Sequence, residues 1–319
     1  EYPTPVIFPG LGVNEHIVQI EGYDRTFMAL TNLGNVYTWG NNNYGQLGIG
    51  TSNYNFNSSS GDYRHTANTD RLGTTTSSPA AKVTALGPTT ETGPIFNISM
   101  GQDFAMAVSA GKEIDGELRN VNAVWVWGIN DHGQQGTGFE PYIWNDKDTA
   151  YYWKWYEGSG EIVESIGVVK DLYAYRTPHK VVGQEGIDDL VNITRVAAGN
   201  GHALALRSDS TLYAWGHNAY GQLGDNTKEN HYTPIRVTPG EYDSEAYYLR
   251  DVIRIDAATQ YSMAMMRNGE VYMWGRNYQG VLGVDPAVKA ESLVPMKVTL
   301  TSPITNGEVR AAEINAGIN

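Results

Sequence analysis

The apolar residues of this sequence come in short runs that turn-forming residues separate. The runs are four to seven residues long and rich in Val, Ile, Tyr, Trp and Met, with Gly, Asn and Pro between them. Small and larger apolar residues alternate in HALAL from His202 and in FAMAV from Phe104. Successive side chains of a strand point to opposite faces, so this alternation predicts strands that pack tightly on one face. No segment keeps a 3.6-residue apolar period for three turns, and the sequence therefore predicts an all-β protein.

A Trp-Gly pair recurs four times along the chain. The pairs are Trp39-Gly40, Trp127-Gly128, Trp215-Gly216 and Trp274-Gly275. A similar polar turn follows each pair, as in YTWGNNNYGQLG from Tyr37 and YAWGHNAYGQLG from Tyr213. The glycines of this turn supply positive φ. Asparagines in it tolerate the same region or bond their own backbone, and these are Asn41, Asn130, Asn218 and Asn277.

Two further elements recur with each pair. Upstream lies a Gly or Ala, a polar stretch and an apolar run, and the copies start at Gly22, Gly101, Gly199 and Ala258. Downstream lies a Pro followed closely by Val, and the copies start at Pro79, Pro178, Pro234 and Pro295. Only the second cycle carries an extra loop, around residues 112–120. The chain thus passes four times through three predicted strands and begins a fifth cycle near Ile314.

One cycle forms a small antiparallel sheet that cannot cover both of its faces. Such a sheet is expected to stack on the next one, which is the physical reason for the repetition. The tryptophan of each cycle is predicted to fill the space between neighbouring sheets. We therefore expect a single repeat-built region over residues 1–319, with insertions at about 51–78 and 139–176.

The motif W-G-x-N-x-x-G-Q-L-G, preceded by G-x-x-H-x-x-A-L, resembles the repeat of the regulator of chromosome condensation family. The segment from Gly199 to Gly224 matches it most closely, while Gln135 and Val281 depart from it. The resemblance implies a β-propeller, commonly seven-bladed, whose members mostly bind proteins. The eukaryotic founder is a nucleotide-exchange factor that docks on chromatin, and a bacterial relative inhibits β-lactamases. Fold alone does not carry the partner over to this chain.

Four cycles and part of a fifth do not complete a ring of seven blades. We expect a fragment of such a ring, or an open assembly that another copy completes. Edge strands left open at either end favour self-association.

Composition and charge narrow the partners. The chain has 319 residues, 41% of them hydrophobic, which is enough for a sizeable core. A net charge of -13 disfavours DNA and RNA. The absence of cysteine excludes disulfides, thiol catalysis and Cys-ligated zinc. No apolar run is long enough to predict a membrane span. The 21 Tyr with abundant Asn, Thr and Gly favour an extracellular or cell-surface bacterial protein, and a cytoplasmic location stays open.

No catalytic motif stands out, so the sequence predicts a protein that is not an enzyme and has no cofactor or metal site. A nucleophile elbow, a P-loop and a dinucleotide-binding loop are all missing. His202 is predicted to pack or to bond a turn, and nothing in the sequence pairs His132 and His217 as metal ligands. The oxygens of Asp225-Asn226-Thr227 and Asp146-Lys147-Asp148 lack the spacing of a calcium loop. A pair of carboxylates contributed by different sheets leaves glycoside hydrolysis open.

Function is expected on the two insertions, because loops carry most binding residues of repeat scaffolds. The first insertion is rich in Ser, Thr and Asn and predicts a flexible surface loop. The second is crowded with aromatic residues, and the candidate binding residues are Tyr142, Trp144, Tyr151, Tyr152, Trp153, Trp155 and Tyr156. Such rings anchor a protein partner or stack on sugars; alternatively they pack on one another in a hairpin around Gly158-Ser159-Gly160.

The sequence therefore predicts a non-enzymatic scaffold that binds another protein. Two alternatives remain: a propeller that binds or cleaves carbohydrate, and a structural subunit of a surface assembly.

Overall fold

A computed structural model describes residues 5–50, 54–57, 62–65, 80–138, 174–242, 246–300 and 310–316. In these ranges the regular structure consists of strands and two short 3-10 turns, which confirms the predicted all-β class. No helix in these ranges is long and apolar enough to cross a membrane.

Four antiparallel sheets of four strands follow one another along the chain. Sheet 1 contains β1 (Ile17–Tyr23), β2 (Thr26–Thr31), β3 (Val36–Gly40) and β6 (Ala81–Lys82). Sheet 2 contains β7 (Ile95–Met100), β8 (Phe104–Ser109), β11 (Val124–Ile129) and β12 (Ala174–Lys180). Sheet 3 contains β13 (Ile193–Ala198), β14 (His202–Arg207), β15 (Leu212–Gly216) and β16 (His231–Arg236). Sheet 4 contains β17 (Val252–Ala257), β18 (Tyr261–Met266), β19 (Val271–Arg276) and β20 (Glu291–Val298).

Each sheet has one strand more than the three predicted elements. The additional strand is the first one, represented by β1, β7, β13 and β17. It ends within one residue of the Gly or Ala with which the first repeated element begins. The repeated motif therefore marks the start of the second strand, and a search anchored on it passes over the strand before it.

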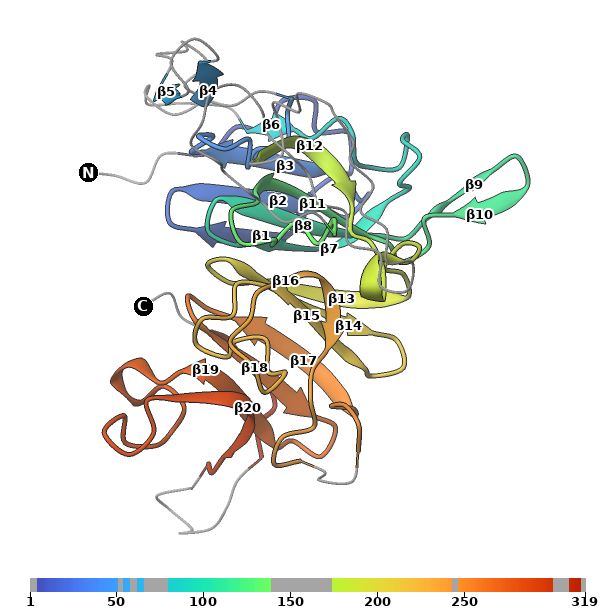
Figure 1. The fold of residues 1–319 in the computed structure, drawn as a ribbon. Coiled ribbons are helices and arrows are strands. Elements are labelled where there is room, and N and C mark those ends of the chain that lie inside the picture. The colour runs from blue at the N-terminus through green and yellow to red at the C-terminus, as the bar shows by residue number, and fades with distance from the viewer. Residues whose placement is uncertain are drawn as a thin grey trace, which may run out of the picture.

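The remaining elements lie in the connections between these strands. They are the pair β4 (Tyr54–Asn57) and β5 (Asp62–His65), the pair β9 (Lys112–Ile114) and β10 (Glu117–Arg119), η1 (Gln184–Gly186) and η2 (Tyr278–Gly280). The β9–β10 hairpin is the extra loop predicted for the second cycle, and it projects away from the sheets (Figure 1).

Two strand pairings lie at the predicted insertions. In the first insertion β4 and β5 pair with each other as a hairpin. The second insertion, predicted to end at about 176, gives way to sheet 2 at 174. Ala174 and Tyr175 already pair with β11, because the fourth strand of sheet 2 begins at this point.

The sheets stack in chain order, from blue to red in Figure 1. We call the face that packs on the preceding sheet the front face, and the opposite face the back face. In β14, Ala203 and Ala205 belong to the core shared with sheet 2, whereas Leu204 and Leu206 belong to the core shared with sheet 4. The alternation in HALAL thus puts small residues on the front face and large ones on the back face.

Polar side chains link the first strands of neighbouring sheets. The backbone N–H of Ala198 in β13 donates to Ser99 Oγ in β7 at 3.0 Å. The N–H of Ala316 donates to Asp256 Oδ2 in β17 at 2.6 Å, in the corresponding place. Residues 310–316 therefore lie against sheet 4 much as β13 lies against sheet 2, where the sequence predicts a fifth cycle to begin.

Candidate interaction surface

Three of the four repeated tryptophans lie between neighbouring sheets. Trp127, Trp215 and Trp274 are fully buried. Each indole Nε1 donates a 2.9 Å hydrogen bond to a backbone carbonyl in the loop after the third strand of the preceding sheet. The acceptors, in the same order, are Gln46, Gln134 and Gln222. These indoles join adjacent sheets and are not accessible to a ligand.

The loops that accept the indoles share one construction. In each, an Asn Oδ1 accepts a hydrogen bond from the N–H five residues later; the pairs are Asn42 with Leu47, Asn130 with Gln135, Asn218 with Leu223, and Asn277 with Leu282. In sheet 1 this residue is Asn42 and not the predicted Asn41. The last glycine of the loop lies so close to the indole that no side chain fits there: a Cβ on Gly224 would lie 2.7 Å from Trp274 Nε1.

Trp39, in sheet 1, has a different environment. It is only half-buried, and its ring stacks on Phe27 of β2 at a centroid distance of 5.5 Å. Phe8 contacts it edge-on at 5.6 Å. Within the described part of the chain, its Nε1 makes no hydrogen bond and no sheet lies before it. The prediction that every tryptophan lies between two sheets therefore does not hold for Trp39 in this chain.

Polar loop residues lie at one end of the strands in every sheet. The second strand begins and the third strand ends there, as the pairing of Thr26 with Gly40 and of His202 with Gly216 shows. We call this end of the stacked sheets the loop face; its charged and histidine residues include Asp24, Arg25, Asp103, Asp131, His132, His217 and Arg276. Both insertions lie in connections that leave the loop face from a third strand to a fourth strand, between β3 and β6 and between β11 and β12.

Loops of neighbouring sheets touch one another along the loop face. Gln46 Nε2 donates to Asp103 Oδ1 at 2.6 Å, joining sheets 1 and 2. The rings of His132 and His217 lie 4.3 Å apart and join sheets 2 and 3. The sequence does not predict this contact between the rings. Their spacing in the sequence gives no hint of it, because it depends on how two sheets are placed.

Sheets 3 and 4 meet at Arg276. Its guanidinium lies over the ring of Tyr220 at 4.7 Å and over that of Tyr278 at 5.4 Å. Arg276 also donates to Gln260 Oε1 at 2.6 Å. A guanidinium held between two rings is a fixed cation at this end of the loop face.

The other end of the loop face is acidic. Burial raises the pKa of Asp103 to about 6, and the charges of Asp24 and Asp131 add to the shift. Burial also acts to raise the pKa of Asp131, but hydrogen bonds from His132 and Gln134 outweigh it and the pKa lies below its usual value. Burial, together with the neighbouring His132, lowers the pKa of His217 to about 4. The loop face therefore carries three carboxylates on sheets 1 and 2, one of them paired with Arg25, and a cation, Arg276, on sheet 4.

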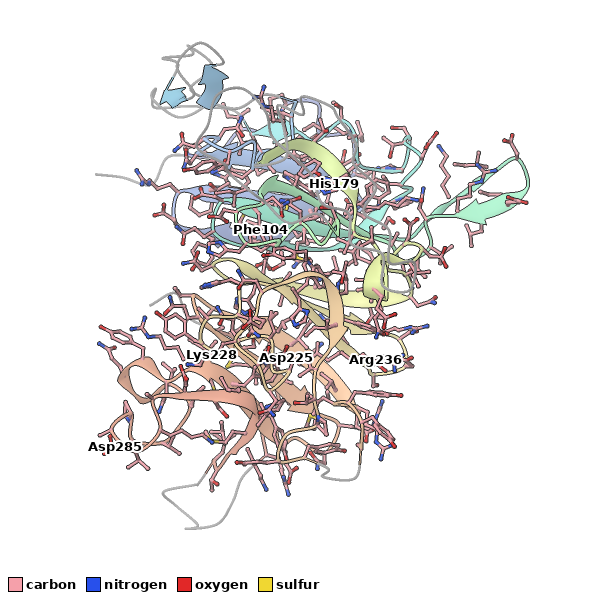
Figure 2. All side chains as sticks on the ribbon, viewed as in Figure 1. Phe104, His179, Asp225, Lys228, Arg236 and Asp285 are labelled. Carbon is pink, nitrogen blue, oxygen red and sulfur yellow. The ribbon has the colours of Figure 1, made fainter. Side chains whose placement is uncertain are left out.

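His202 lies inside the stack and not on the loop face. Its Nε2 is 2.9 Å from Ser262 Oγ, and Ser262 in turn donates to the carbonyl of Gln222 at 2.7 Å. Since the serine proton is used in that second bond, His202 donates through Nε2. Burial lowers the pKa of His202 to about 3. Phe104 is the corresponding residue of sheet 2 and is also fully buried (Figure 2).

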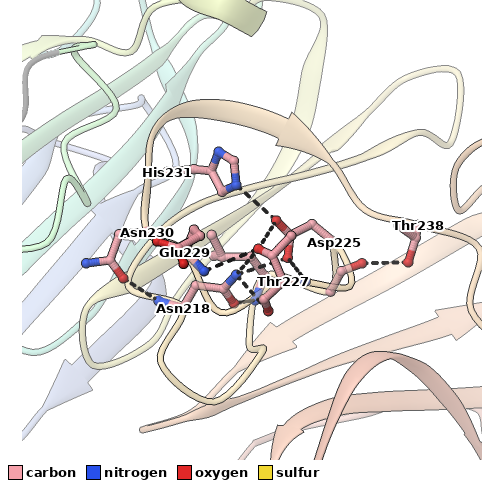
Figure 3. A network of polar contacts seen from close by, with 9 residues as sticks. Asn218, Asp225, Thr227, Glu229, Asn230, His231 and Thr238 are labelled. Carbon is pink, nitrogen blue, oxygen red and sulfur yellow. Dashed lines mark hydrogen bonds and ion pairs between the residues drawn. The ribbon is translucent and has the colours of Figure 1, made fainter.

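Asp225 organises a loop of sheet 3 (Figure 3). It accepts hydrogen bonds from His231 Nε2 at 2.9 Å, Thr227 Oγ1 at 2.6 Å and Asn218 Nδ2 at 3.0 Å. Burial acts to raise the pKa of Asp225, but these bonds outweigh it and hold the pKa at about 2. The carboxylate is thus engaged in folding the loop. Across the described ranges, no group of three or more His, Asp or Glu side chains is placed to hold a metal ion.

The seven aromatic residues predicted to bind a partner lie outside the described residues. They belong to residues 139–173, which leave the described structure after Gly138 and return at Ala174. Both points lie on the loop face, next to the loop that holds Asp131 and His132. The sequence placed function on the insertions but gave no sign of the row of polar residues beside them.

In this structure four-stranded antiparallel sheets are stacked, and a tryptophan on the third strand of one sheet bonds the loop of the sheet before it. Such sheets are the blades of a β-propeller. Family models described as the regulator of chromosome condensation (RCC1) repeat match residues 17–46 and 193–222, and residues 34–62, 209–265 and 268–317. Together they cover just over half of the chain. The chain belongs to the RCC1 repeat family, as its sequence motifs indicated.

Two plant proteins are among its relatives. The chain is 27% identical over 271 residues to the mitochondrial RCC1 domain-containing protein RUG3 of Arabidopsis thaliana, covering 85% of this chain and 44% of the relative. It is 24% identical over 261 residues to the ultraviolet-B receptor UVR8 of the same plant, covering 82% and 41%. The chain therefore spans less than half the length of these relatives.

Solved structures share the fold. Yeast RCC1 (Prp20), in its complex with Kap60, is 20% identical with a TM-score of 0.58, covering 93% of this chain and 51% of that one. Prp20p of Saccharomyces cerevisiae alone gives 20% identity and a TM-score of 0.57, covering 93% and 53%. At this identity the likeness establishes the architecture only.

Proposed function

We propose that this chain is a non-enzymatic scaffold that binds another protein across its loop face. The supporting observation is that the loops of all four sheets lie side by side on the loop face, and that both long insertions start there. The stacked sheets hold these loops at fixed spacing, so an extended partner meets several of them at once. Binding residues on loops that a rigid scaffold positions are a common arrangement.

The charges of the loop face favour a partner with charges of opposite sign in the same order. Asp24, which pairs with Arg25, and Asp103 lie on sheets 1 and 2, and Arg276 lies on sheet 4. A protein segment with a cation at one end and an acid at the other matches this order, and such matching sets orientation more than affinity. The net charge of -13 opposes a nucleic-acid partner.

The solved relatives support a protein as the class of partner. One yeast structure contains RCC1 (Prp20) bound to Kap60, and a second concerns the binding of Prp20p to Gsp1p and histones. Those partners belong to those proteins. An extracellular or cell-surface setting is part of our proposal and rests on composition.

We assign the aromatic insertion the role of anchor in this proposal. Trp153 and Trp155 belong to the stretch that leaves the loop face between β11 and β12. Buried Trp and Tyr side chains dominate binding energy in many protein interfaces, whereas surrounding charges tune the rate and orientation. Removal of the rings is therefore expected to cost more affinity than a charge change on the loop face.

The test is a binding measurement with matched variants. The chain is used as bait, the captured protein is purified, and its affinity is measured for wild type, for Trp153→Ala with Trp155→Ala, and for Asp24→Lys. Glu117→Lys is the control, because it makes the same charge change on the β9–β10 hairpin away from the loop face. We expect about a tenfold or greater loss with the double variant and a smaller loss with Asp24→Lys.

Other outcomes decide against the proposal. Equal affinity for all four proteins would remove the loop face as the binding surface. Saturable binding to a glycan array that disappears in the Trp153→Ala, Trp155→Ala protein would favour the carbohydrate alternative. Release of a sugar product would show that the chain is an enzyme.

A further inference from the structure

We propose that Arg195 and Arg254 bind a small oxyanion between the first strands of sheets 3 and 4. The site lies on β13 and β17 and not in the loops of the loop face, so it does not depend on the proposed protein partner. The bound group is a phosphate or a carboxylate, both of which present several acceptor oxygens to arginine.

One position of the first strand reaches the backbone of the next sheet. The residues that hold it, which pair with equivalent residues of the second strand, are Gln19, Asn97, Arg195 and Arg254. In sheet 2, Asn97 Oδ1 accepts a hydrogen bond from the N–H of Val196 in β13 at 2.8 Å. In sheet 1, Gln19 Nε2 donates to the carbonyl of Ile98 in β7 at 3.0 Å. A side chain at this position therefore meets the following first strand.

Sheet 3 has no acceptor at this position. Ile255 holds in sheet 4 the place that Val196 holds in sheet 3, because each pairs with an alanine of the second strand. The side chain that corresponds to Asn97 is here Arg195, and a guanidinium has donors only. Among the described residues, no side-chain oxygen takes the place of Asn97 Oδ1 for the N–H of Ile255. The junction therefore brings two donors together and lacks an acceptor.

Arg254 adds a second positive charge at the same junction. Partial burial and the nearby charge of Arg254 lower the pKa of Arg195 below its usual value. Within the described part of the chain, neither guanidinium has an ion-pair or hydrogen-bond partner. The carboxylate of Asp256, two residues further along β17, instead accepts the N–H of Ala257 at 2.8 Å and that of Ala316 at 2.6 Å. Two like charges without an acid between them repel, and a bound anion would remove this repulsion.

The donor set defines the chemistry of the ligand. Arginine binds phosphate and carboxylate oxygens through two parallel hydrogen bonds, and a backbone N–H adds a third donor. The guanidinium groups of Arg195 and Arg254 and the N–H of Ile255 offer no lone pair, so a cation has nothing to bind among these three groups. The chain has a net charge of -13, so its overall field does not attract anions, and this local pair of arginines has to supply the attraction.

Titration with sodium phosphate and with sodium acetate tests the site, with sodium chloride keeping the ionic strength constant. A ligand that binds only the folded state raises the melting temperature as its concentration rises, so thermal denaturation follows binding. We expect a saturable rise with at least one of the two oxyanions beyond that in chloride. The lower dissociation constant of the two shows whether the site prefers phosphate or carboxylate.

Three variants and a control assign the effect to the two arginines. Arg195→Gln and Arg254→Gln should each raise the dissociation constant about tenfold or more. Arg195→Lys keeps the charge without the planar fork and should raise it less. Arg119→Gln is the matched control and should change nothing, because Arg119 lies on the β9–β10 hairpin, where it pairs with Glu117 at 3.5 Å.

Arg195→Asn separates anion binding from a structural role of the guanidinium. It gives sheet 3 the residue that sheet 2 has at this position, so the N–H of Ile255 gains an acceptor and the like charge is removed. We expect this variant to lose the response to oxyanions and to melt in chloride at the wild-type temperature or above.

Three results would overturn the proposal. One is a melting temperature that phosphate and acetate raise no more than chloride does. The second is an equal response of wild type, Arg195→Gln and Arg254→Gln, which would indicate adventitious binding elsewhere. The third is a large fall in the melting temperature of Arg195→Asn in chloride, since the guanidinium itself would then stabilise the junction.

Discussion

Tyr23 Oη lies 3.1 Å from Thr259 Oγ1, so the first and last sheets touch although 236 residues separate the two side chains. Tyr23 ends β1, and Thr259 lies in the turn between β17 and β18. Both are next to the loop face, where the four sheets therefore converge on a common axis. Burial raises the pKa of Tyr23 above its usual value, so the hydroxyl stays protonated to a higher pH than in a free tyrosine.

Loss of this contact should slightly lower the stability of the stacked sheets. We expect Tyr23→Phe to lower the free energy of unfolding by about 1 kcal/mol, since it removes one hydrogen bond and keeps the ring. Tyr247→Phe is the control, because Tyr247 is 96% exposed. Urea unfolding measures both, and an equal effect of the two changes would mean that the Tyr23 contact contributes nothing.

The four tryptophans should differ in what they contribute to stability. Trp215→Ala removes a fully buried indole and its hydrogen bond, and we expect it to lower the free energy of unfolding by about 3–5 kcal/mol. Trp39→Ala should lower it by about 1–2 kcal/mol, because that ring is half-buried and packs on Phe27. Denaturant unfolding at low protein concentration makes the comparison. Equal losses would contradict the difference in environment.

Two glycines provide a matched pair for the indole contact. Gly224 has φ +70 and Gly283 has φ +79, so alanine meets similar backbone strain at each, about 1 kcal/mol. Only at Gly224 would the new Cβ also strike an indole, that of Trp274. We expect Gly224→Ala to cost about 2 kcal/mol more than Gly283→Ala in thermal or denaturant unfolding. Indistinguishable losses would show that strain alone decides both positions.

Asp103 should make stability fall as pH rises. Its folded-state pKa of about 6 lies above the unfolded value, so the folded protein binds the proton more tightly and ionisation opposes folding. The contribution is most favourable below about pH 4 and is lost as pH rises through 6. Asp103→Asn should therefore be more stable than wild type at pH 8, by about 1–3 kcal/mol, and nearly equal to it at pH 4.

Melting temperatures of the two proteins across this pH range test the assignment. Gln46 Nε2 donates to Asp103 Oδ1, and the amide oxygen of an asparagine accepts the same bond, so the variant isolates the charge. A stability difference that does not change between pH 4 and pH 8 would contradict it.

The repeated motifs predict the sheets well, because the residues that define them act within one sheet or against its immediate neighbour. Gly216 marks the end of a third strand, and the alternation in HALAL decides which side chains face which sheet. The motifs do not predict the first strand of each sheet. IVQIEGY, from Ile17, exposes Val18 and Ile20, and only its last two residues, Gly22 and Tyr23, belong to the repeated element.

Features that depend on how sheets are placed could not be predicted. His132 and His217 meet because two loops of different sheets lie side by side, and no local pattern encodes that distance. Trp39 has the same motif as Trp127 but not the same environment, since the environment comes from another sheet. Phe27, where other cycles have Ala or Ser, is the one sign in the sequence that the front of sheet 1 differs.

The partner of each buried indole is a main-chain carbonyl and not a side chain. Any residue offers such an oxygen, so the loop sequence can drift without loss of the bond, provided that the closing glycine keeps room for the ring. Each cycle is for this reason an exchangeable module. Deletion of one inner cycle removes two junctions and creates one, and duplication adds one; each new junction again needs only a loop carbonyl and a glycine that leaves room for the indole.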